Sequence, residues 1–310
     1  MSVPDPLDAA ARAGWLYYVG GLTQDQIADQ MGISRQRAQR LVSRAMQEGL
    51  VRVRLEHPIA ACLELEARLR DRYELADVRV APTLGNHVAR TIGPVAAAVF
   101  DRVLAREDTH VVGLGIGRAL AAMAPEVTAR ARPDQSLVSL IGNIADDGLA
   151  SQFAIIMTLA SRLGAPHYPM PAPVIVSSAE ERRALLTLRA LRSVRALGQR
   201  ADATFVGVGQ MGSHAPLLAE GFVTVADLEK LERRGAVGEI TGHVFDADGA
   251  YIETALNDRL TSIRIEPGSP RLAVGVAGGA AKVAALRAAL KGLLLNVLVT
   301  DEATAAALLE

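Results

Sequence analysis

The sequence predicts an α/β protein with two domains, a small N-terminal winged helix-turn-helix and a larger Rossmann-like parallel α/β domain. Two short helical patterns meet at Gly32, and arginine is concentrated in the second of them. Beyond Pro58, short apolar runs alternate with helical patterns rich in alanine and leucine, which favours a parallel sheet covered by helices. The chain has 310 residues and 50% hydrophobic composition, enough for two cores. We expect the domains over residues 1–57 and 58–310.

Composition and charge exclude several classes of protein. The formal net charge is −1, so the arginines near the N-terminus are a local concentration in a nearly neutral chain. The single cysteine, Cys62, cannot form an internal disulfide, and the six histidines show no zinc-ligand spacing. The apolar region 272–299 is interrupted by basic residues, and the N-terminus lacks a signal-peptide pattern. We expect a cytoplasmic protein with no metal, no cofactor and no membrane contact.

The N-terminal residues predict three helices. A helix over residues 7–19, which carries Trp15, supplies an apolar face for the two helices that follow. Thr23 is a favourable N-cap for the second helix, whose apolar residues repeat at helical spacing, and Gly32 ends that helix. Ser34 caps the third helix, whose apolar residues point inward.

The outward face of the third helix is basic and polar, which points to DNA. Arginine pairs with guanine and glutamine with adenine, so residues at the start of this helix suit the major groove. Later arginines suit phosphates, as do two arginines in a wing strand expected over residues 49–57. We assign base contacts in double-stranded operator DNA to Arg35, Gln36 and Arg37, phosphate contacts to Arg40, Arg44, Arg52 and Arg54, and further contacts to Thr23, Gln24 and Ser34. The alternative is an amphipathic helical hairpin with a solvated charged face.

The second domain is expected to begin after Pro58 with an amphipathic helix over residues 59–73, which suits a connection between domains or a contact with another subunit. Strands are expected over residues 78–80, 110–115, 137–141, 174–176, 203–208, 272–276 and 296–300. Helices are expected over residues 92–104, 118–123, 151–163, 179–197 and 280–290. A further pair of strands is expected at 239–245 and 251–254.

Three of the expected strands end in loops that contain glycine, residues 112–118, 206–212 and 274–282. The carboxyl ends of strands in an open α/β sheet form the ligand crevice, so we expect these loops to share one pocket for a small polar ligand. Lys282 falls in the first turn of a helix, whose free N–H groups favour an anionic or electron-rich group. The alternative is that the glycines only permit tight turns and that Lys282 is solvated.

Two suggestive motifs near the second loop do not predict chemistry. Residues 207–212 have G-x-G-x-x-G spacing, but no helix opens directly from these glycines, so we reject a dinucleotide site. Ser213 and His214 are adjacent in sequence, and adjacent side chains rarely face each other as a nucleophile and its base must. Asp246 and Asp248 fit a hairpin turn that ends in Asp-Gly, and we also retain Asp246 as a candidate ligand contact.

Several segments resemble the SorC branch of bacterial transcriptional regulators, over nearly the full length and in the same order. These segments are Gly21-Leu-Thr-Gln-Asp-Gln-Ile-Ala-Asp-Gln-Met-Gly-Ile-Ser34, Ala203-Thr-Phe-Val-Gly-Val-Gly209, Gly235-Ala-Val-Gly-Glu-Ile-Thr-Gly-His-Val-Phe-Asp-Ala-Asp-Gly249, Val276-Ala-Gly-Gly-Ala-Ala-Lys-Val-Ala-Ala-Leu286 and Asn296-Val-Leu-Val-Thr-Asp-Glu-Ala-Thr304. The resemblance implies a sugar- or polyol-responsive repressor or activator of a carbohydrate operon. It also implies a sugar-binding domain related to sugar-phosphate isomerase and deaminase folds, and a homotetramer or dimer.

The resemblance further implies an effector site built from the three glycine loops. The residues it assigns to the effector, with Asp246 added from the turn, are Gly115, Gly117, Arg118, Gly207, Gly209, Gln210, Glu239, Asp246 and Lys282. The family commonly has a threonine where this chain has Ala119, so a hydroxyl suited to a phosphate oxygen is missing. We therefore favour an unphosphorylated sugar or sugar alcohol, while Arg118 and Lys282 leave a phosphorylated sugar open.

Two rival functions follow from the same residues. A sugar-phosphate-metabolising enzyme of the isomerase or deaminase kind would use the N-terminal motif only for assembly, and its general base would be Glu239 or Asp246. Turnover of a phosphosugar would support it. A DNA-binding architectural protein would bind its site regardless of any sugar, and it would leave the glycine loops unexplained.

Overall fold

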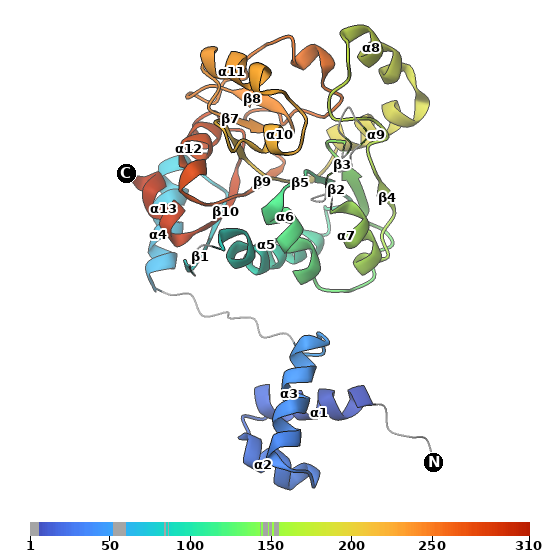
Figure 1. The fold of residues 1–310 in the computed structure, drawn as a ribbon, viewed down its shortest axis with the longest axis vertical. Helices are drawn as coiled ribbons and strands as arrows, with labels where there is room; N and C mark the ends of the chain where they lie inside the picture. The colour runs from blue at the N-terminus through green and yellow to red at the C-terminus, as the bar shows by residue number, and fades with distance from the viewer. Residues whose placement is uncertain are drawn as a thin grey trace. The chain divides into compact units, whose positions relative to one another are not determined.

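The computed structural model describes residues 6–51, 60–83, 85, 87–142, 144, 148, 151 and 155–310. The chain divides into two compact units, Met1–His57 and Pro58–Glu310, each of which we describe by itself (Figure 1). Among the described residues, no helix is both long and apolar enough to cross a bilayer.

The first unit packs three helices around one apolar core. Helices α1 (Pro6–Tyr18), α2 (Gln24–Met31) and α3 (Arg35–Gln47) occur where the sequence predicts them. Thr23 and Gln26 form a reciprocal capping box at the start of α2, and Gly32 ends α2 in the left-handed conformation, with φ of 63°. The core consists of Ala13, Leu16, Ile27, Ala28, Ala38 and Val42. The predicted helix-turn-helix is thus confirmed.

The predicted wing lies largely outside the described residues. Residues 49–51 form a turn and bends, and the positions of Arg52 and Arg54 are not among those described. The wing strand and its two phosphate contacts remain predictions.

The second unit is built on a parallel seven-stranded sheet with the order β1-β10-β9-β5-β2-β3-β4. The strands are β1 (Asp77–Ala81), β2 (Val111–Leu114), β3 (Ser136–Ser139), β4 (His167–Tyr168), β5 (Ala203–Val206), β9 (Leu272–Val276) and β10 (Val297–Asp301). Alternate residues of a strand enter opposite cores, as in β10, where Leu298 joins one core and Val299 the other. The parallel α/β prediction is confirmed.

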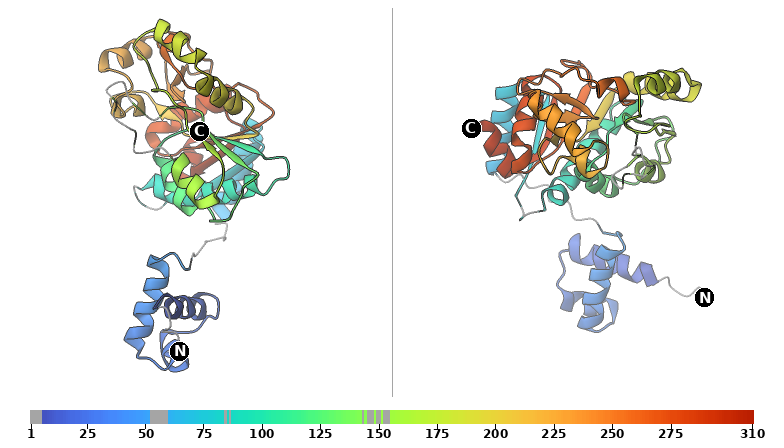
Figure 2. Two further views of the ribbon diagram at one scale, coloured as in Figure 1. Left: turned by 90° about the vertical axis from the view of Figure 1, so that its right-hand side faces the viewer. Right: turned by 45° about the horizontal axis from the view of Figure 1, so that its top comes forward.

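Helices cover both faces of this sheet (Figures 1 and 2). One core receives side chains from α4 (Ala60–Tyr73), α9 (Arg189–Gln199), α12 (Val283–Lys291) and α13 (Glu302–Leu309). The opposite core receives side chains from α5 (Val88–Leu104), α6 (Arg118–Met123) and α7 (Ile156–Leu163). Burial on both faces explains why the strands read as continuous apolar runs.

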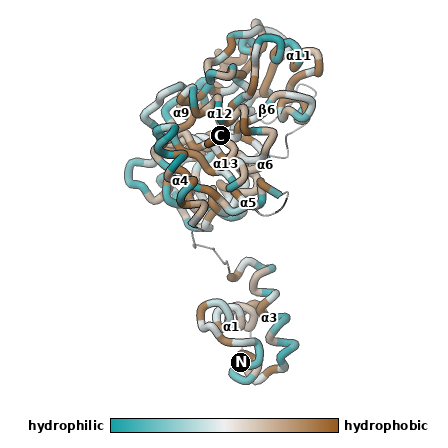
Figure 3. Tube along the Cα trace, turned by 90° about the vertical axis from the view of Figure 1, so that its left-hand side faces the viewer, coloured by the Kyte–Doolittle hydropathy of each residue, from teal (hydrophilic) through white to brown (hydrophobic). Residues whose placement is uncertain are grey.

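Helix α4, the first described element after residue 57, is attached firmly to this unit. Its residues Cys62 and Leu69 are 3% and 0% exposed, and its tube in Figure 3 carries both hydrophobic and hydrophilic colours. Glu66 is buried as well, and its Oε1 accepts a hydrogen bond of 2.9 Å from the backbone N–H of Val80 in the edge strand β1. This contact satisfies a backbone donor that a sheet edge would otherwise leave unpaired.

The reversal of strand order lies between β2 and β5. These strands are neighbours in the sheet, although β3 and β4 come between them in the sequence. The loops that follow β2 and β5 therefore meet, and Gly115 N–H donates a hydrogen bond of 2.8 Å to the Phe205 carbonyl. In open α/β sheets, a ligand crevice forms at the carboxyl ends of the strands at such a point.

A small antiparallel sheet extends from the loop after β5. It contains β6 (Gly209–Gln210), β7 (Gly238–Ile240) and β8 (His243–Phe245), and α10 (Pro216–Ala219) and α11 (Val225–Arg233) pack beside it around a third apolar core. The expected pairing of strands 239–245 and 251–254 is wrong in part. Thr241 and Gly242 both have positive φ, so the chain reverses there and 239–245 forms a hairpin of its own. Tyr251 forms one isolated bridge to Phe245.

Two other expected elements differ from the structure. Residues 174–176 do not join the parallel sheet, and Ile175 forms one antiparallel bridge with Leu260. Pro171 and Pro173 lack the N–H groups that a ladder needs, which disfavours a central strand here. The expected helix 179–197 is divided into α8 (Ala179–Thr187) and α9 at Leu188, which is extended with ψ of 130°.

Candidate functional site

The exposed face of α3 is the candidate DNA-binding surface. Its residues Arg35, Gln36, Arg37, Arg40 and Arg44 are all exposed, whereas Ala38 and Val42 on the opposite side are buried in the three-helix core. The basic side chains therefore remain available for a ligand outside the unit. This arrangement suits base readout at the start of the helix and phosphate contacts further along.

Two exposed ion pairs involve this surface. Arg35 Nε lies 3.4 Å from Asp25 of α2, and Arg44 Nε lies 3.6 Å from Glu48. Exposed pairs of this kind contribute little to stability, so both arginines can exchange their partner for a phosphate or a base at small cost.

Two of the predicted DNA contacts, Thr23 and Ser34, are the N-cap residues of α2 and α3. The Ser34 hydroxyl accepts a hydrogen bond of 3.3 Å from Arg37 N–H, and the Thr23 hydroxyl is engaged with Gln26. Gln24, the first residue of α2, is half-buried. Thr23 and Ser34 hold the helix starts in place, and direct contact with DNA remains a prediction for all three residues.

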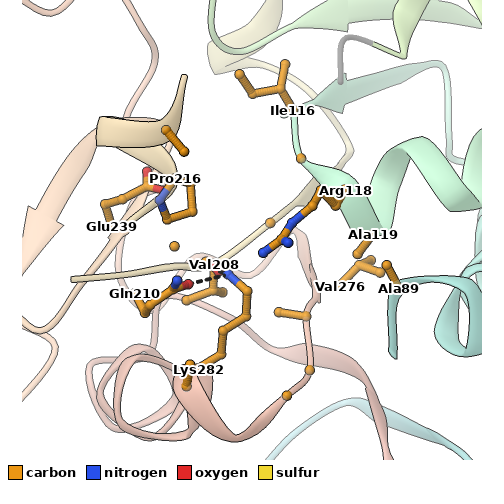
Figure 4. Close-up of a pocket in the computed structure, with 18 of the residues that line it drawn as sticks. Ala89, Ile116, Arg118, Ala119, Val208, Gln210, Pro216, Glu239, Val276 and Lys282 are labelled. Carbon is orange, nitrogen blue, oxygen red and sulfur yellow. Dashed lines mark hydrogen bonds between the residues drawn. The ribbon is translucent and has the colours of Figure 1, made fainter. Parts of the chain in front are cut away.

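The α/β unit contains a cavity of about 900 Å³ at the carboxyl ends of β2, β5 and β9 (Figure 4). We call it the effector cavity. It brings the three glycine loops together, since eight of the nine assigned residues line it, namely Gly115, Gly117, Arg118, Gly207, Gly209, Gln210, Glu239 and Lys282. That an effector contacts these residues remains a prediction.

Glycine allows the first two loops to touch. A Cβ atom at Gly115 would lie 3.3 Å from Val206 Cα, and one at Gly207 would lie 3.2 Å from the Ile116 carbonyl oxygen. Both distances are too short for an ordinary contact, so larger residues would push the loops apart. The glycines therefore fix the separation of the two cavity walls.

Lys282 reaches into the effector cavity from the end of the 3₁₀ helix η3 (Ala280–Lys282), directly before α12 and so one residue before the first turn of that helix, where it was expected. Its Nζ donates to the Val208 carbonyl and to Gln210 Oε1, the latter at 2.9 Å, and Gln210 Nε2 donates to the His214 carbonyl at 2.8 Å. Burial lowers the pKa of Lys282 to about 8, the carboxylate of Glu239 opposes that shift, and the guanidinium of Arg118 adds to it. Lys282 is therefore a cation held by neutral acceptors and close to its titration range.

Glu239, in β7, places a carboxyl group in the cavity wall. The residue is 9% exposed, and its Oε2 accepts a hydrogen bond of 2.8 Å from Gly242 N–H. Burial raises the pKa of Glu239, and the positive charge of Lys282 acts in the opposite direction. Figure 4 shows Glu239 on one side of the cavity and Arg118 on the other, with Lys282 and Gln210 between them. A ligand here meets both acceptors and donors.

Asp246 does not belong to this cavity, which corrects the sequence assignment. Its Oδ1 accepts hydrogen bonds from the N–H groups of Asp248, at 2.9 Å, and Ala250, at 3.0 Å. The carboxylate therefore stabilises the turn that was also expected for it. It is absent from the residues that line the effector cavity within the described part of the chain.

Further polar residues that were not predicted from the sequence also line the cavity. His87 and Arg90, at the start of α5, line the cavity, as does Thr241 in the turn after β7. The rule that strand ends form the crevice also applies to the loop after β1 and would have found the first two. That loop has no glycine cluster to mark it. Among the described residues, no group of three His, Cys, Asp or Glu residues is arranged to hold a metal ion.

An exposed basic recognition helix in one unit and a polar cavity at strand ends in the other define a DNA-binding regulator with a ligand-binding domain. Comparisons with known proteins agree with this class. Residues 57–310 match the family model described as "Putative sugar-binding domain", and residues 13–58 match the model of the MarR family.

Three relatives extend over nearly the whole chain. The erythritol catabolism regulatory protein EryD of Brucella abortus (strain 2308) is 35% identical and covers 97% of this chain and 96% of its own length. The transcriptional regulator LsrR of Escherichia coli (strain K12) is 33% identical over 97% of this chain and 94% of LsrR. The crystal structure of the full-length sorbitol operon regulator SorC of Klebsiella pneumoniae has a TM-score of 0.79 at 25% identity, with all of both chains covered.

The chain belongs to the SorC family of sugar-binding transcriptional regulators. Its relatives regulate transcription, which supports the regulator and argues against the sugar-phosphate enzyme considered from the sequence.

Proposed function

We propose that this regulator responds to an unphosphorylated sugar or sugar alcohol bound in the effector cavity. The observation that carries the proposal is the buried carboxyl group of Glu239 in the cavity wall. A carboxyl group accepts hydrogen bonds from ligand hydroxyl groups, and in its ionised form it repels a phosphate placed against it. Ala119, beside Arg118, supplies no hydroxyl for a phosphate oxygen.

The other polar groups of the cavity complement a polyol. Gln210 offers an amide, Lys282 offers an ammonium group, and Arg118 extends toward the same space from the opposite wall (Figure 4). A chain of hydroxyl groups can donate to Glu239 and accept from these cations at the same time. The similarity to EryD, whose name refers to erythritol catabolism, makes erythritol the first compound to test.

A phosphorylated sugar is the second candidate, favoured by one observation. Arg118 and Lys282 both reach into the cavity, and two cations suit a phosphate group better than a neutral ligand. The first candidate predicts binding of free sugars or sugar alcohols and the second predicts binding of their phosphate esters, so one screen with both kinds of compound distinguishes them.

A thermal-shift screen of the full chain tests the effector class. A compound that binds the native state and not the unfolded chain raises the melting temperature, and the rise grows with the logarithm of its concentration above Kd. We expect erythritol or another free polyol to raise it, and the corresponding phosphate esters to have a smaller effect. A response confined to phosphate esters would transfer the proposal to phosphosugars, and no response to any sugar would contradict a sugar effector.

On the DNA side, we propose that Arg35, Gln36 and Arg37 read bases and that Arg40 and Arg44 contact phosphates. The predicted wing arginines Arg52 and Arg54 would add phosphate contacts, and Thr23, Gln24 and Ser34 would approach the backbone at the helix starts. Helix-turn-helix proteins commonly read two half-sites as dimers, so we propose a dimer or a homotetramer.

We further propose that the protein is a repressor released from its operator by the effector. Such control requires the effector to bind the DNA-free arrangement more tightly, typically by about 1–3 kcal/mol. Selection of a binding site from random double-stranded DNA, followed by titration of the complex with the effector, measures this difference. Tighter DNA binding in the presence of effector would contradict release, and light scattering of the free protein gives the number of subunits.

A further inference from the structure

A second cavity of the α/β unit, of about 570 Å³, has no role in the function proposed above. It contacts Thr204 near the amino end of β5 and Leu272 at the amino end of β9, whereas the effector cavity follows the carboxyl ends of the same strands. We call it the arginine cavity, because Arg182, Arg195, Arg264 and Arg271 line it.

The positive charges of this cavity lie deeper than its negative charges. Arg182 on α8, Arg195 on α9 and Arg264 are half-buried, while the acidic lining residues Glu253, Asp258 and Glu266 are exposed. Burial and the charge of Arg182 both lower the pKa of Arg195. An anion inside the cavity would offset this unfavourable concentration of positive charge.

The guanidinium groups have donors to spare. Arg182 Nε donates to the Leu260 carbonyl, and Arg195 Nη1 donates to the carbonyls of Thr261 and Ser262. A guanidinium has five N–H donors, so these bonds occupy only part of each group. Of the three half-buried arginines, Arg264 is the one with an ion pair within 4.0 Å among the described residues, to Glu253 at 3.1 Å.

His243 adds an unsatisfied polar group to the same lining. The residue is 8% exposed, and its Nε2 lies 3.3 Å from Ser262 Oγ, while its Nδ1 has no hydrogen-bond partner within the described part of the chain. Burial, together with the charges of Arg264, Arg195 and Arg182, lowers the pKa of His243 to about 4. Buried polar nitrogens are normally hydrogen-bonded, and a ligand bound in this cavity would give His243 Nδ1 a partner.

We propose that the arginine cavity is a second ligand site, which binds the oxyanion group of a small metabolite between Arg182, Arg195 and Arg264, beside His243. Phosphate and carboxylate share the chemistry that would be recognised, because both accept hydrogen bonds from a guanidinium fork. The site is separate from the effector cavity and does not depend on which sugar occupies that cavity.

One hairpin links the two sites. Glu239 in β7 lines the effector cavity, and His243 in β8 lines the arginine cavity, with Ile240 paired to His243 in the ladder between them. This hairpin is the element through which a ligand at one site would act on the other. We expect the oxyanion to change the affinity for the effector, and reciprocally.

Isothermal titration calorimetry of the full chain with inorganic phosphate, and separately with citrate, tests the site. We expect binding of at least one of them in the millimolar range or tighter. Arg195→Gln should weaken it at least tenfold, and the same should hold for Arg182→Gln. Arg192→Gln, on the exposed side of α9, should leave it unchanged. The Lys282→Met protein should bind as the unaltered chain does, since Lys282 lies in the effector cavity.

Two further measurements distinguish loss of the binding site from loss of the fold. Arg195→Lys keeps the charge and loses the planar fork, so it should bind more weakly while circular dichroism and melting temperature report a folded protein. The His243 ring resonances should move with phosphate until the site is saturated. Absence of heat with both probes would overturn the proposal and leave the proposed sugar effector unaffected. Binding that survives Arg182→Gln and Arg195→Gln but is lost in Lys282→Met would also overturn it, and would favour a phosphorylated sugar in the effector cavity.

Discussion

Gly209 packs directly against the carboxyl group of Glu239, since a Cβ atom at position 209 would lie 2.0 Å from Glu239 Oε1. The two residues pair across β6 and β7, so neither backbone can withdraw without breaking the small sheet. The absence of a side chain at position 209 therefore sets where the carboxyl group stands in the effector cavity. An acceptor for ligand hydroxyl groups is held at a fixed place.

Gly209→Ala should displace Glu239 and weaken effector binding at least tenfold, or by about 1.4 kcal/mol or more, because the ligand loses an aligned acceptor. Calorimetric titration with the compound identified by thermal shift measures the loss. Glu239→Gln keeps the shape and removes the charge, so it separates geometry from electrostatics. Binding by Gly209→Ala as tight as that of the unaltered chain would show that Glu239 does not contact the effector.

Effector affinity should fall as pH rises above about 8, because the ammonium group of Lys282 then loses its proton. The pKa of Lys282 is lowered in the folded protein, so the cation is present below that value and absent above it. The steepest possible decline is about tenfold per pH unit. Lys282→Arg should remove the decline, because a guanidinium stays charged, and a profile that remains steep in that variant would assign the titration to another group.

Arg37→Ala should weaken binding to the selected operator by about 1–3 kcal/mol while effector affinity stays the same. Arg37 is exposed at the start of α3, where arginine pairs with guanine in the major groove. Fluorescence anisotropy with labelled DNA measures the change. Arg233→Ala, in an exposed ion pair of α11, is the matched control. An equal loss of effector binding in Arg37→Ala would contradict the division of labour between the two units.

Thr304→Val should weaken the response of DNA binding to effector more than it weakens effector binding itself. Thr304 Oγ1 accepts a hydrogen bond of 2.7 Å from Gly279 N–H in the cavity wall and donates to Asp301. Thr304 lies in α13, which packs against α4, so this bond connects the cavity with the helix that follows residue 57. The uncoupling is measured by comparing two quantities, the affinity for the effector and the effector concentration that releases half of the bound DNA. Thr304→Ser keeps the hydroxyl group and should restore the normal response of DNA binding.

The full chain should lose stability as pH falls from 6.5 toward about 4, because His243 must remain neutral to stay buried. In that window the unfolded chain binds a proton that the folded chain does not, so unfolding becomes easier, by about 3 kcal/mol at the acid limit. The groups that oppose protonation are Arg182, Arg195 and Arg264, the last of which is paired with Glu253.

Urea unfolding at several pH values in buffers free of phosphate and citrate measures this effect. His243→Phe should reduce the slope between pH 6.5 and 4, while the exposed His214→Asn should not. Addition of inorganic phosphate should shift the loss to lower pH if the anion also raises the stability of the arginine cavity. An unchanged slope in His243→Phe would assign acid unfolding to other groups.

The helix-turn-helix and the effector cavity could be predicted because local rules determine them. Thr23, Gly32 and Ser34 mark helix ends by capping, and in the structure they do so by hydrogen bonds of their side chains or a positive φ. A parallel sheet brings the carboxyl ends of its strands to one edge, and the three glycine loops meet there because β9, β5 and β2 are neighbours in the sheet.

The remaining site features depend on contacts that local patterns do not carry. Asp246 was retained as a ligand contact beside its expected role in a turn, and local sequence does not show that its carboxylate is occupied by the N–H groups of Asp248 and Ala250. His87 and Arg90 reach the effector cavity from the start of α5, after a loop that has no cluster of glycines. The arginine cavity draws on side chains from Leu140 to Ala273, so only the folded chain brings them together.

The burial of α4 determines how the protein can be divided. Because Cys62 and Leu69 are part of the sheet's core and Glu66 binds the edge strand, α4 belongs to the sugar-binding unit although it follows the DNA-binding unit in sequence. A hybrid regulator that exchanges DNA specificity should therefore be joined before Ala60. A junction after Tyr73 would remove a helix from the edge of the sheet and expose the apolar surface that this helix covers.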